Sequence, residues 1–167
     1  DTVYIKGGTY TDQYISPNNS GTSTQPITYS NYNGEKVTIR DASYGINING
    51  KSYIKVTGID FYNLDHFFYI SSGHHNEISY CKFDKFRTYT WHGARIYKNS
   101  QYNWIHHCEI SRWGSGHSGA ILDIGDEYVT TDNSYYNLIE DNNIYYGGHH
   151  VLGLYSRYSV IRNNYFQ

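Results

Sequence analysis

The sequence predicts an all-β protein in which short strands wind repeatedly around one narrow core. Tyrosine alone accounts for 21 of the 167 residues, and isoleucine, valine and threonine, which also favour strands, are frequent. Glycine, asparagine or serine interrupts each apolar run within a few residues, as between many short strands. A six-residue pattern also recurs along the chain. Together these features predict a solenoid of the right-handed parallel β-helix class, with residues 1–167 forming a single domain.

The recurring pattern has an apolar residue at its first and sixth positions, and a small, thiol or amide residue or isoleucine at its fourth. Its first positions are Val56, Ile78, Ile105, Ile139 and Ile161. Subtracting these numbers gives spacings of 22, 27, 34 and 22 residues, which suit windings joined by loops of unequal length. We therefore expect Ile78, Ile105, Ile139 and Ile161 to lie in a single interior file.

A second short strand precedes each copy of the pattern, and alternation predicts which of its residues point inward. Two inner rows are expected, Ile46, Phe68, Ala94, Ala120, Leu152 and Ile48, Ile70, Ile96, Leu122, Leu154. The matching outward rows are Asn47, Tyr69, Arg95, Ile121, Gly153 and Asn49, Ser71, Tyr97, Asp123, Tyr155. The outward rows are where a ligand could bind.

The fourth position of the pattern predicts what stacks inside the bend of each winding. Asn142 and Asn164 should lie one above the other and hydrogen-bond along the solenoid axis. Cys81 and Cys108 share this column, and we expect buried free thiols there, because parallel neighbours rarely offer disulfide geometry. The outward residues beside this column should form charge ladders, one of Lys82 with Glu109 and one of His106 with Glu140 and Arg162.

Composition excludes several classes of function. The net charge of −2 and the isoelectric point of about 6.5 leave no basic surface for a nucleic acid partner. No apolar run has the length of a membrane span. The many tyrosines and asparagines are typical of exported proteins, so a secreted or cell-surface location is expected.

Four segments carry a resemblance to a known superfamily: residues 1–10, 25–29, 34–39 and 53–59. They resemble the N-terminal part of pectate-lyase-like β-helix proteins, nearest the alginate lyase and chondroitinase B branch and related β-helix-repeat proteins. In those proteins a helix caps the barrel before this point and further windings follow. The resemblance therefore implies an uncapped fragment of a longer protein with flanking segments, in which residues 1–43 form the first coils and 44–167 the regular ones.

The resemblance also implies a polysaccharide partner, held in a groove over the straight strand that follows the longest loops. The loops that enter this strand carry His66, His92, His117 and the pair His149 and His150. Imidazoles at one corner could line a sugar groove and include a general base. The alternative is that they only cap turns or stack on one another.

A polysaccharide lyase that acts by β-elimination needs a cation for the uronate carboxylate, a base and an acid. Arg95 and Lys98 could supply the cation, His117 or Tyr97 the base, and Tyr97 or His150 the acid, with Asp123 beside them. The residues predicted to bind substrate are Tyr69, His92, Lys98, His149 and Tyr155. The sequence predicts no metal site formed by the histidines.

Two questions stay open on sequence alone. The acidic loop that begins with Asp123, Gly125, Asp126 and Glu127 could hold calcium, or it could simply be solvated. The protein could also be a non-catalytic surface or glycan-binding β-helix, or a glycoside hydrolase or epimerase on the same scaffold, since a fold does not fix a function.

Overall fold

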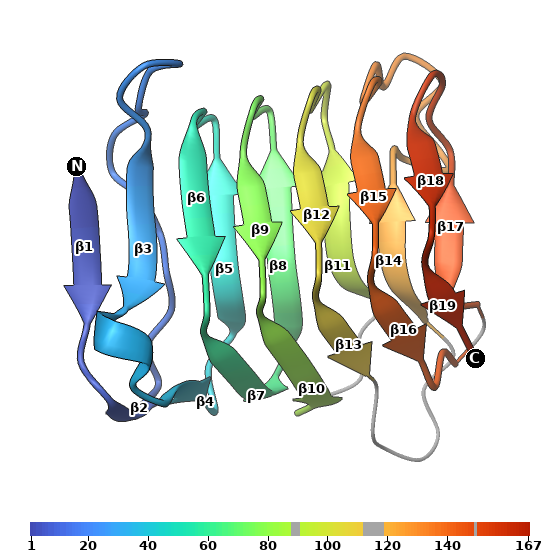
Figure 1. The fold of residues 1–167 in the computed structure, drawn as a ribbon. Coiled ribbons are helices and arrows are strands. Elements are labelled where there is room, and N and C mark those ends of the chain that lie inside the picture. Colours follow the sequence, from blue (N-terminus) through green and yellow to red (C-terminus); the bar gives the residue numbers. More distant parts are fainter. Residues whose placement is uncertain (88–90, 112–118, 149) are drawn as a thin grey trace.

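The computed structural model of the chain describes residues 1–87, 91–111, 119–148 and 150–167. Figure 1 shows short strands winding around a common axis, with the N-terminus at one end of the stack and the C-terminus at the other. Every strand pairing among these residues is parallel. The predicted all-β solenoid is confirmed, and a 3₁₀ turn, η1 (Tyr32–Gly34), interrupts the early windings.

Three parallel sheets form the sides of the solenoid. The first sheet contains β1 (Thr2–Ile5), β3 (Ile27–Asn31), β6 (Ile54–Thr57), β9 (Glu77–Ser79), β12 (Trp104–His106), β15 (Leu138–Glu140) and β18 (Val160–Arg162). The second sheet contains β2 (Gly8–Thr11), β4 (Val37–Arg40), β7 (Asp60–Leu64), β10 (Lys82–Phe86), β13 (Glu109–Ser111), β16 (Asn143–Tyr145) and β19 (Tyr165–Phe166). The third sheet contains β5 (Tyr44–Asn49), β8 (His66–Ser71), β11 (His92–Tyr97), β14 (Ala120–Ile124) and β17 (Leu152–Leu154).

The expected interior file is confirmed. Ile105 pairs with Ile78 on one side and with Ile139 on the other, and Ile139 pairs with Ile161. Phenylalanines fill the wider part of the same core: Phe61 stacks on Phe83 with ring centroids 4.8 Å apart. Burying one such side chain stabilises the fold by roughly 1.5–3 kcal/mol, so stacking of windings accounts for much of the stability.

The bend between the first and second sheets has the amide ladder that the sequence predicts. Asn142 donates from Nδ2 to Oδ1 of Asn164 at 2.9 Å, and its own Oδ1 accepts from the backbone N–H of Cys108. Cys81 and Cys108 are free and buried in the same column, as predicted. Burial raises the pKa of the Cys81 thiol, so it stays protonated.

A second ladder, which the sequence reasoning missed, crosses the bend between the third and first sheets. Asn76 donates to Asn103 and Asn103 to Asn137, each at 3.0 Å between Nδ2 and Oδ1. These asparagines precede β9, β12 and β15 by one residue, so extending the repeat upstream by two positions would have revealed them. All three side chains are buried, and their bonds satisfy backbone groups at the bend.

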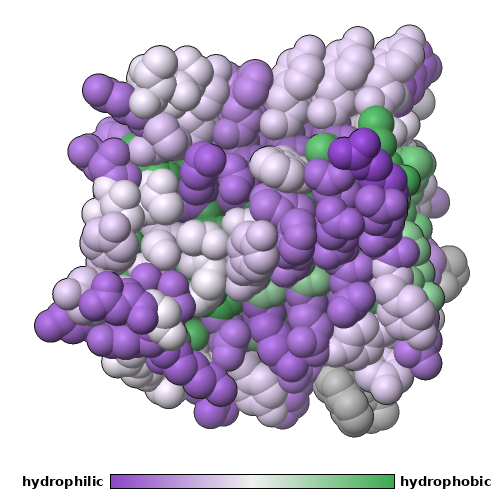
Figure 2. All heavy atoms as spheres, in the orientation of Figure 1, coloured by the Kyte–Doolittle hydropathy of each residue, from purple (hydrophilic) through white to green (hydrophobic). Residues whose placement is uncertain are grey.

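The outer surface is polar. Figure 2 shows one face of the solenoid as mostly hydrophilic or intermediate, with hydrophobic residues visible in gaps between polar side chains and along one edge. Lys82 forms an ion pair with Glu109 at 2.9 Å, and Arg162 pairs with Glu140 at 2.6 Å, which confirms these parts of the charge ladders. Within the described residues, no helix has the length and apolar character needed to cross a bilayer.

Candidate functional site

The outward face of the third sheet carries the residues that the sequence singled out, but one strand lies in a different register from the predicted one. Asp123 pairs with Arg95, which in turn pairs with Tyr69. The prediction that Asp123 shares a row with Tyr97, and Ile121 with Arg95, is therefore wrong by two residues. The inner residues of β14 shift by the same two positions, so that Leu122 and not Ala120 lies beside Ala94, and Ile124 lies beside Ile96. On the next winding, Leu152 lies beside Leu122 and Leu154 beside Ile124.

The cause of this shift lies at the entrance to β14. A two-residue slip keeps every side chain on its own face of the strand, so alternation alone cannot detect it. The register places Ile121 beside Gly93, where both approach Phe86. A β-carbon on Gly93 would overlap the Phe86 ring, so the glycine leaves the space in which the corner packs. Ile121 is consequently buried and does not face a groove.

Asp123 occupies the centre of the site. Its side chain is only 1% exposed, yet it contacts two imidazoles from the windings on either side. Oδ2 is hydrogen-bonded to Nδ1 of His92, and Oδ1 lies 3.3 Å from Nε2 of His150. A carboxylate that accepts an imidazole N–H fixes the ring's tautomer and orientation, and leaves the other ring nitrogen as an acceptor.

The corner of imidazoles is present in part. His66 and His92 lie on adjacent windings, and Nδ1 of His66 is 3.0 Å from the carbonyl oxygen of His92. The next position along the column is Ala120, and the pairing of Leu122 with Leu152 brings His150 beside that alanine. Burial lowers the pKa of His66, so its ring is neutral near pH 7. His117 and His149, predicted as a catalytic and a substrate-binding residue, lie outside the described residues.

Arg95 is held rigidly beside Asp123. Its guanidinium lies 4.4 Å from the centre of the Tyr97 ring, and Nη2 forms an ion pair with Asp126 at 3.1 Å. Its Nε is buried and, among the described residues, is the one buried side-chain polar atom without a hydrogen-bond partner. The arginine is thus desolvated by its neighbours and retains unused donor capacity.

Three further predicted residues surround this arginine. Tyr69 lies against Tyr97 with ring centroids 5.7 Å apart, and burial raises the pKa of its hydroxyl. Nζ of Lys98 lies 5.1 Å from the Tyr97 ring centre. The Tyr97 ring therefore contacts two cations, and it forms a platform for Arg95.

A cavity of about 500 Å³ opens over Asp123. His92, His150 and Tyr155 line it together with Trp91, Glu127 and Tyr128. Burial raises the pKa of the Tyr155 hydroxyl, and the charge of Asp123 adds to that effect. Glu127 and Tyr128 were not predicted as substrate contacts, although their place in the longest insertion, directly after Asp123, was a usable signal.

The acidic loop does not have the form of a calcium site. Asp126 pairs with Arg95 and accepts the backbone N–H of Tyr128 at 3.0 Å, while Asp123 is bonded to histidines. In the described ranges, no three histidine, cysteine or acidic side chains converge as a metal site would require. Asp126 is instead the partner of Arg95, and Asp123 orients the two imidazoles.

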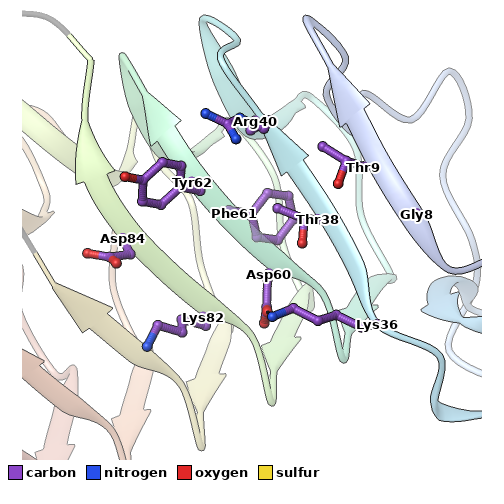
Figure 3. Close-up of a pocket in the computed structure, with 10 residues that line it drawn as sticks. All are labelled: Gly8, Thr9, Lys36, Thr38, Arg40, Asp60, Phe61, Tyr62, Lys82 and Asp84. Carbon is purple, nitrogen blue, oxygen red and sulfur yellow. The ribbon is translucent and has the colours of Figure 1, made fainter.

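A second cavity, of about 540 Å³, lies on the outer face of the second sheet. Figure 3 shows Lys36 directed towards Asp60, with Tyr62 on the same strand as Asp60 and with Lys82 and Asp84 on the next strand, β10. The lysines here have acidic partners: Nζ of Lys36 lies 3.8 Å from Asp60, and Lys82 pairs with Glu109. In this second cavity, lysines are thus paired with carboxylates of other windings. The Asp123 cavity differs, because two imidazoles converge there on a buried carboxylate.

Parallel sheets, interior files and amide ladders define this molecule as a right-handed parallel β-helix. The model of the family described as "Right handed beta helix region" matches residues 44–167, and the chain belongs to that family. No curated protein sequence is significantly similar to the chain.

Several solved structures share the fold. An alginate lyase from Paenibacillus sp. str. FPU-7 superimposes with a TM-score of 0.79 and 17% identity over 99% of this chain and 59% of its own. The pectate lyase Pel9A gives 0.77 and 20% identity, over 98% of this chain and 44% of its own. A family 6 polysaccharide lyase, Pedsa3628 from Pseudopedobacter saltans, gives 0.57 and 14% identity, over 99% and 52%. The chain spans less than two thirds of the length of each.

Proposed function

We propose that this chain carries the catalytic groove of an exported polysaccharide lyase that cleaves an anionic glycan by β-elimination. The observation that carries the proposal is the buried Asp123 carboxylate, bonded to His92 and His150 beside Arg95 and under an open cavity. The similarity to alginate and pectate lyases supports the substrate class through the fold alone.

β-Elimination removes the proton on the carbon next to the uronate carboxylate and expels the glycosidic oxygen from the neighbouring carbon. Negative charge develops on the carboxylate as the proton leaves, so a fixed cation lowers the barrier. Arg95 has this role in the proposal, because Tyr97 and Asp126 hold its guanidinium in place in the strand next to Asp123. Lys98 adds positive charge further along the glycan.

His150 takes the proton in this scheme. Asp123 accepts the N–H at Nε2 of His150, so Nδ1 is left as the acceptor that receives the substrate proton. The electron pair of the broken C–H bond forms the new double bond, and the bond to the leaving oxygen breaks. Tyr155, whose pKa is raised, stays protonated and donates its proton to that oxygen.

The remaining groups position the substrate. His92 lines the same cavity and is oriented by the same carboxylate, while Trp91 and Tyr128 present apolar surface at the rim. Sugar rings have apolar faces that pack on aromatic side chains. His92 and Tyr155, both predicted as substrate contacts, thus line the same cavity. Tyr69 packs against Tyr97, the ring on which Arg95 lies.

The test is an activity screen of the full protein on alginate, pectate, chondroitin and a neutral glycan, with calcium and with a chelator. Unsaturated chain ends absorb ultraviolet light, whereas hydrolysis releases reducing ends without that absorbance. We expect absorbance with at least one uronate polymer and none with the neutral glycan. Reducing ends without absorbance would indicate a hydrolase, and silence in both assays would reject an enzyme.

One observation favours a second candidate, a non-catalytic exterior β-helix. Five rings form a stack along one corner: Tyr53, His75, Tyr102, Tyr136 and Tyr158, with successive centroids 5.0, 5.0, 5.2 and 5.4 Å apart. Rings packed face to face turn their edges outward, so this column stiffens the outside of the solenoid and offers few faces to sugars. Glycan binding without turnover in the screen above would support this candidate.

A further inference from the structure

Two neighbouring histidines lie at the corner where the first sheet passes into the second, away from the Asp123 cavity. His106 ends β12 and is buried, whereas His107 adopts a left-handed backbone conformation with φ of 52° and is exposed. Their rings are nearly perpendicular, at 84°, and their Nδ1 atoms are only 2.8 Å apart. The two Nδ1 atoms therefore share one proton in a hydrogen bond, and removing that proton would leave two nitrogen lone pairs close together.

Aromatic neighbours hold both rings in this arrangement. Trp104 stacks on His106 with a centroid separation of 3.8 Å, and Tyr80 stacks on His107 at 4.8 Å. Because the rings are already immobilised, a ligand that binds both loses little side-chain entropy on binding.

Glu77 selects which nitrogen of His106 is available. Its Oε1 lies 3.4 Å from Nε2 of His106, and its Oε2 is paired with Lys55 at 2.7 Å. A carboxylate at Nε2 retains the proton there and leaves Nδ1 with a lone pair, as for histidines that bind metals. Burial lowers the pKa of His106, so the ring is neutral near pH 7.

The separation of the two nitrogens, now spanned by their hydrogen bond, also fits one coordination geometry better than another. Two metal–nitrogen bonds of about 2.0 Å at a right angle place the nitrogens about 2.8 Å apart, whereas a tetrahedral angle requires about 3.3 Å. Adjacent ligands at right angles are typical of square-planar or octahedral ions. We propose that His106 and His107 chelate Cu(II) or Ni(II) through their Nδ1 atoms, with water in the remaining positions. Binding displaces to solvent the proton that the two nitrogens share.

A second pair provides an internal comparison. His74 and His75 also have their Nδ1 atoms 2.9 Å apart, and His75 stacks between Tyr53 and Tyr102. In the described part of the chain, however, neither the His74 nor the His75 ring is bonded to a carboxylate. No carboxylate therefore fixes which ring nitrogen carries the proton. We expect the His74 and His75 pair to bind the same ions more weakly than the His106 and His107 pair.

The test is a Cu(II) titration of the full protein at pH 7.5, followed by electron paramagnetic resonance and tryptophan fluorescence. The background variant is His74→Ala with His75→Ala, which leaves one pair. We expect one Cu(II) per chain with nitrogen coordination, and quenching of Trp104, which stacks on His106. Adding His107→Ala should weaken binding at least tenfold, and Glu77→Gln about tenfold, while circular dichroism stays unchanged.

Two results would overturn the proposal. One is a titration that is the same with and without His107, in protein whose circular dichroism shows that it is folded. The other is Zn(II) competing more strongly than Ni(II), because a preference for the tetrahedral ion contradicts the right-angle geometry. Zn(II) and Ni(II) are added singly as chlorides, and the measurement does not depend on lyase activity.

Discussion

Gly153 lies in register with Asp123, and a β-carbon on this glycine would overlap Oδ1 of that carboxylate. The same β-carbon would lie 2.9 Å from Nε2 of His150, so the glycine provides the space in which the aspartate meets the histidine. The site therefore depends on a residue with no functional group. This relationship yields the first prediction.

Gly153→Ala should displace the Asp123 carboxylate from His150 and lower kcat/KM at least tenfold in the lyase assay. Overpacking of this kind costs about 1–3 kcal/mol, so the variant should still fold. The control is Gly34→Ala, which has a φ of 75° and open space around it, and which should lose stability without losing activity. Full activity in folded Gly153→Ala would show that the carboxylate is not needed there.

Asp123→Asn keeps the size of the side chain but removes the charge that pairs with two imidazoles. We expect kcat to fall about 10²-fold or more, because the amide no longer holds His150 in the tautomer that accepts a proton. Asp84→Asn on the second sheet, where the carboxylate bonds to Ser111, is the matched control and should be fully active. Equal activity in the two variants would contradict the proposed role of Asp123.

His66 should make the protein less stable in acid. Burial holds the folded-state pKa of His66 below the usual 6.5, so below that pH the unfolded chain binds the proton more readily. This contribution to stability is complete above pH 6.5 and is lost as the pH falls towards the folded-state pKa. The free energy of unfolding, measured with urea, should fall less between pH 7.5 and pH 5 for His66→Phe than for the unsubstituted protein. This variant keeps an aromatic ring to stack on Tyr44. An equal loss would exclude His66 as a source.

Asn103→Ala should destabilise the solenoid by about 3 kcal/mol in equilibrium unfolding. Oδ1 of Asn103 accepts two bonds from Asn76, and Nδ2 donates to Gly73 and Asn137, so the truncation leaves several buried groups unpaired. Gln101→Ala removes an exposed amide from the same corner and should cost only about 0.5 kcal/mol. Similar losses for the two variants would indicate that the ladder does not carry this stability.

The sequence was sufficient for the features that repeat from one winding to the next. Spacing of apolar residues located the file through Ile105, and the fourth position located the Asn142 ladder and the free thiols, since stacked windings place equivalent residues together. The choice of Arg95 and Asp123 as members of one face followed from alternation along the strands, and His150 was selected because several entering loops carry histidines. Their roles in catalysis stay predictions.

Tertiary structure decided what those residues touch. A slip of two residues leaves the inward and outward faces unchanged, so the sequence pattern was equally consistent with Asp123 beside Tyr97 or beside Arg95. The structure has the second register, with Ile121 beside Gly93, and that register brings two imidazoles onto one buried carboxylate. Periodicity along the chain specifies which way a side chain points, whereas its neighbours across windings depend on how loops of unequal length pack.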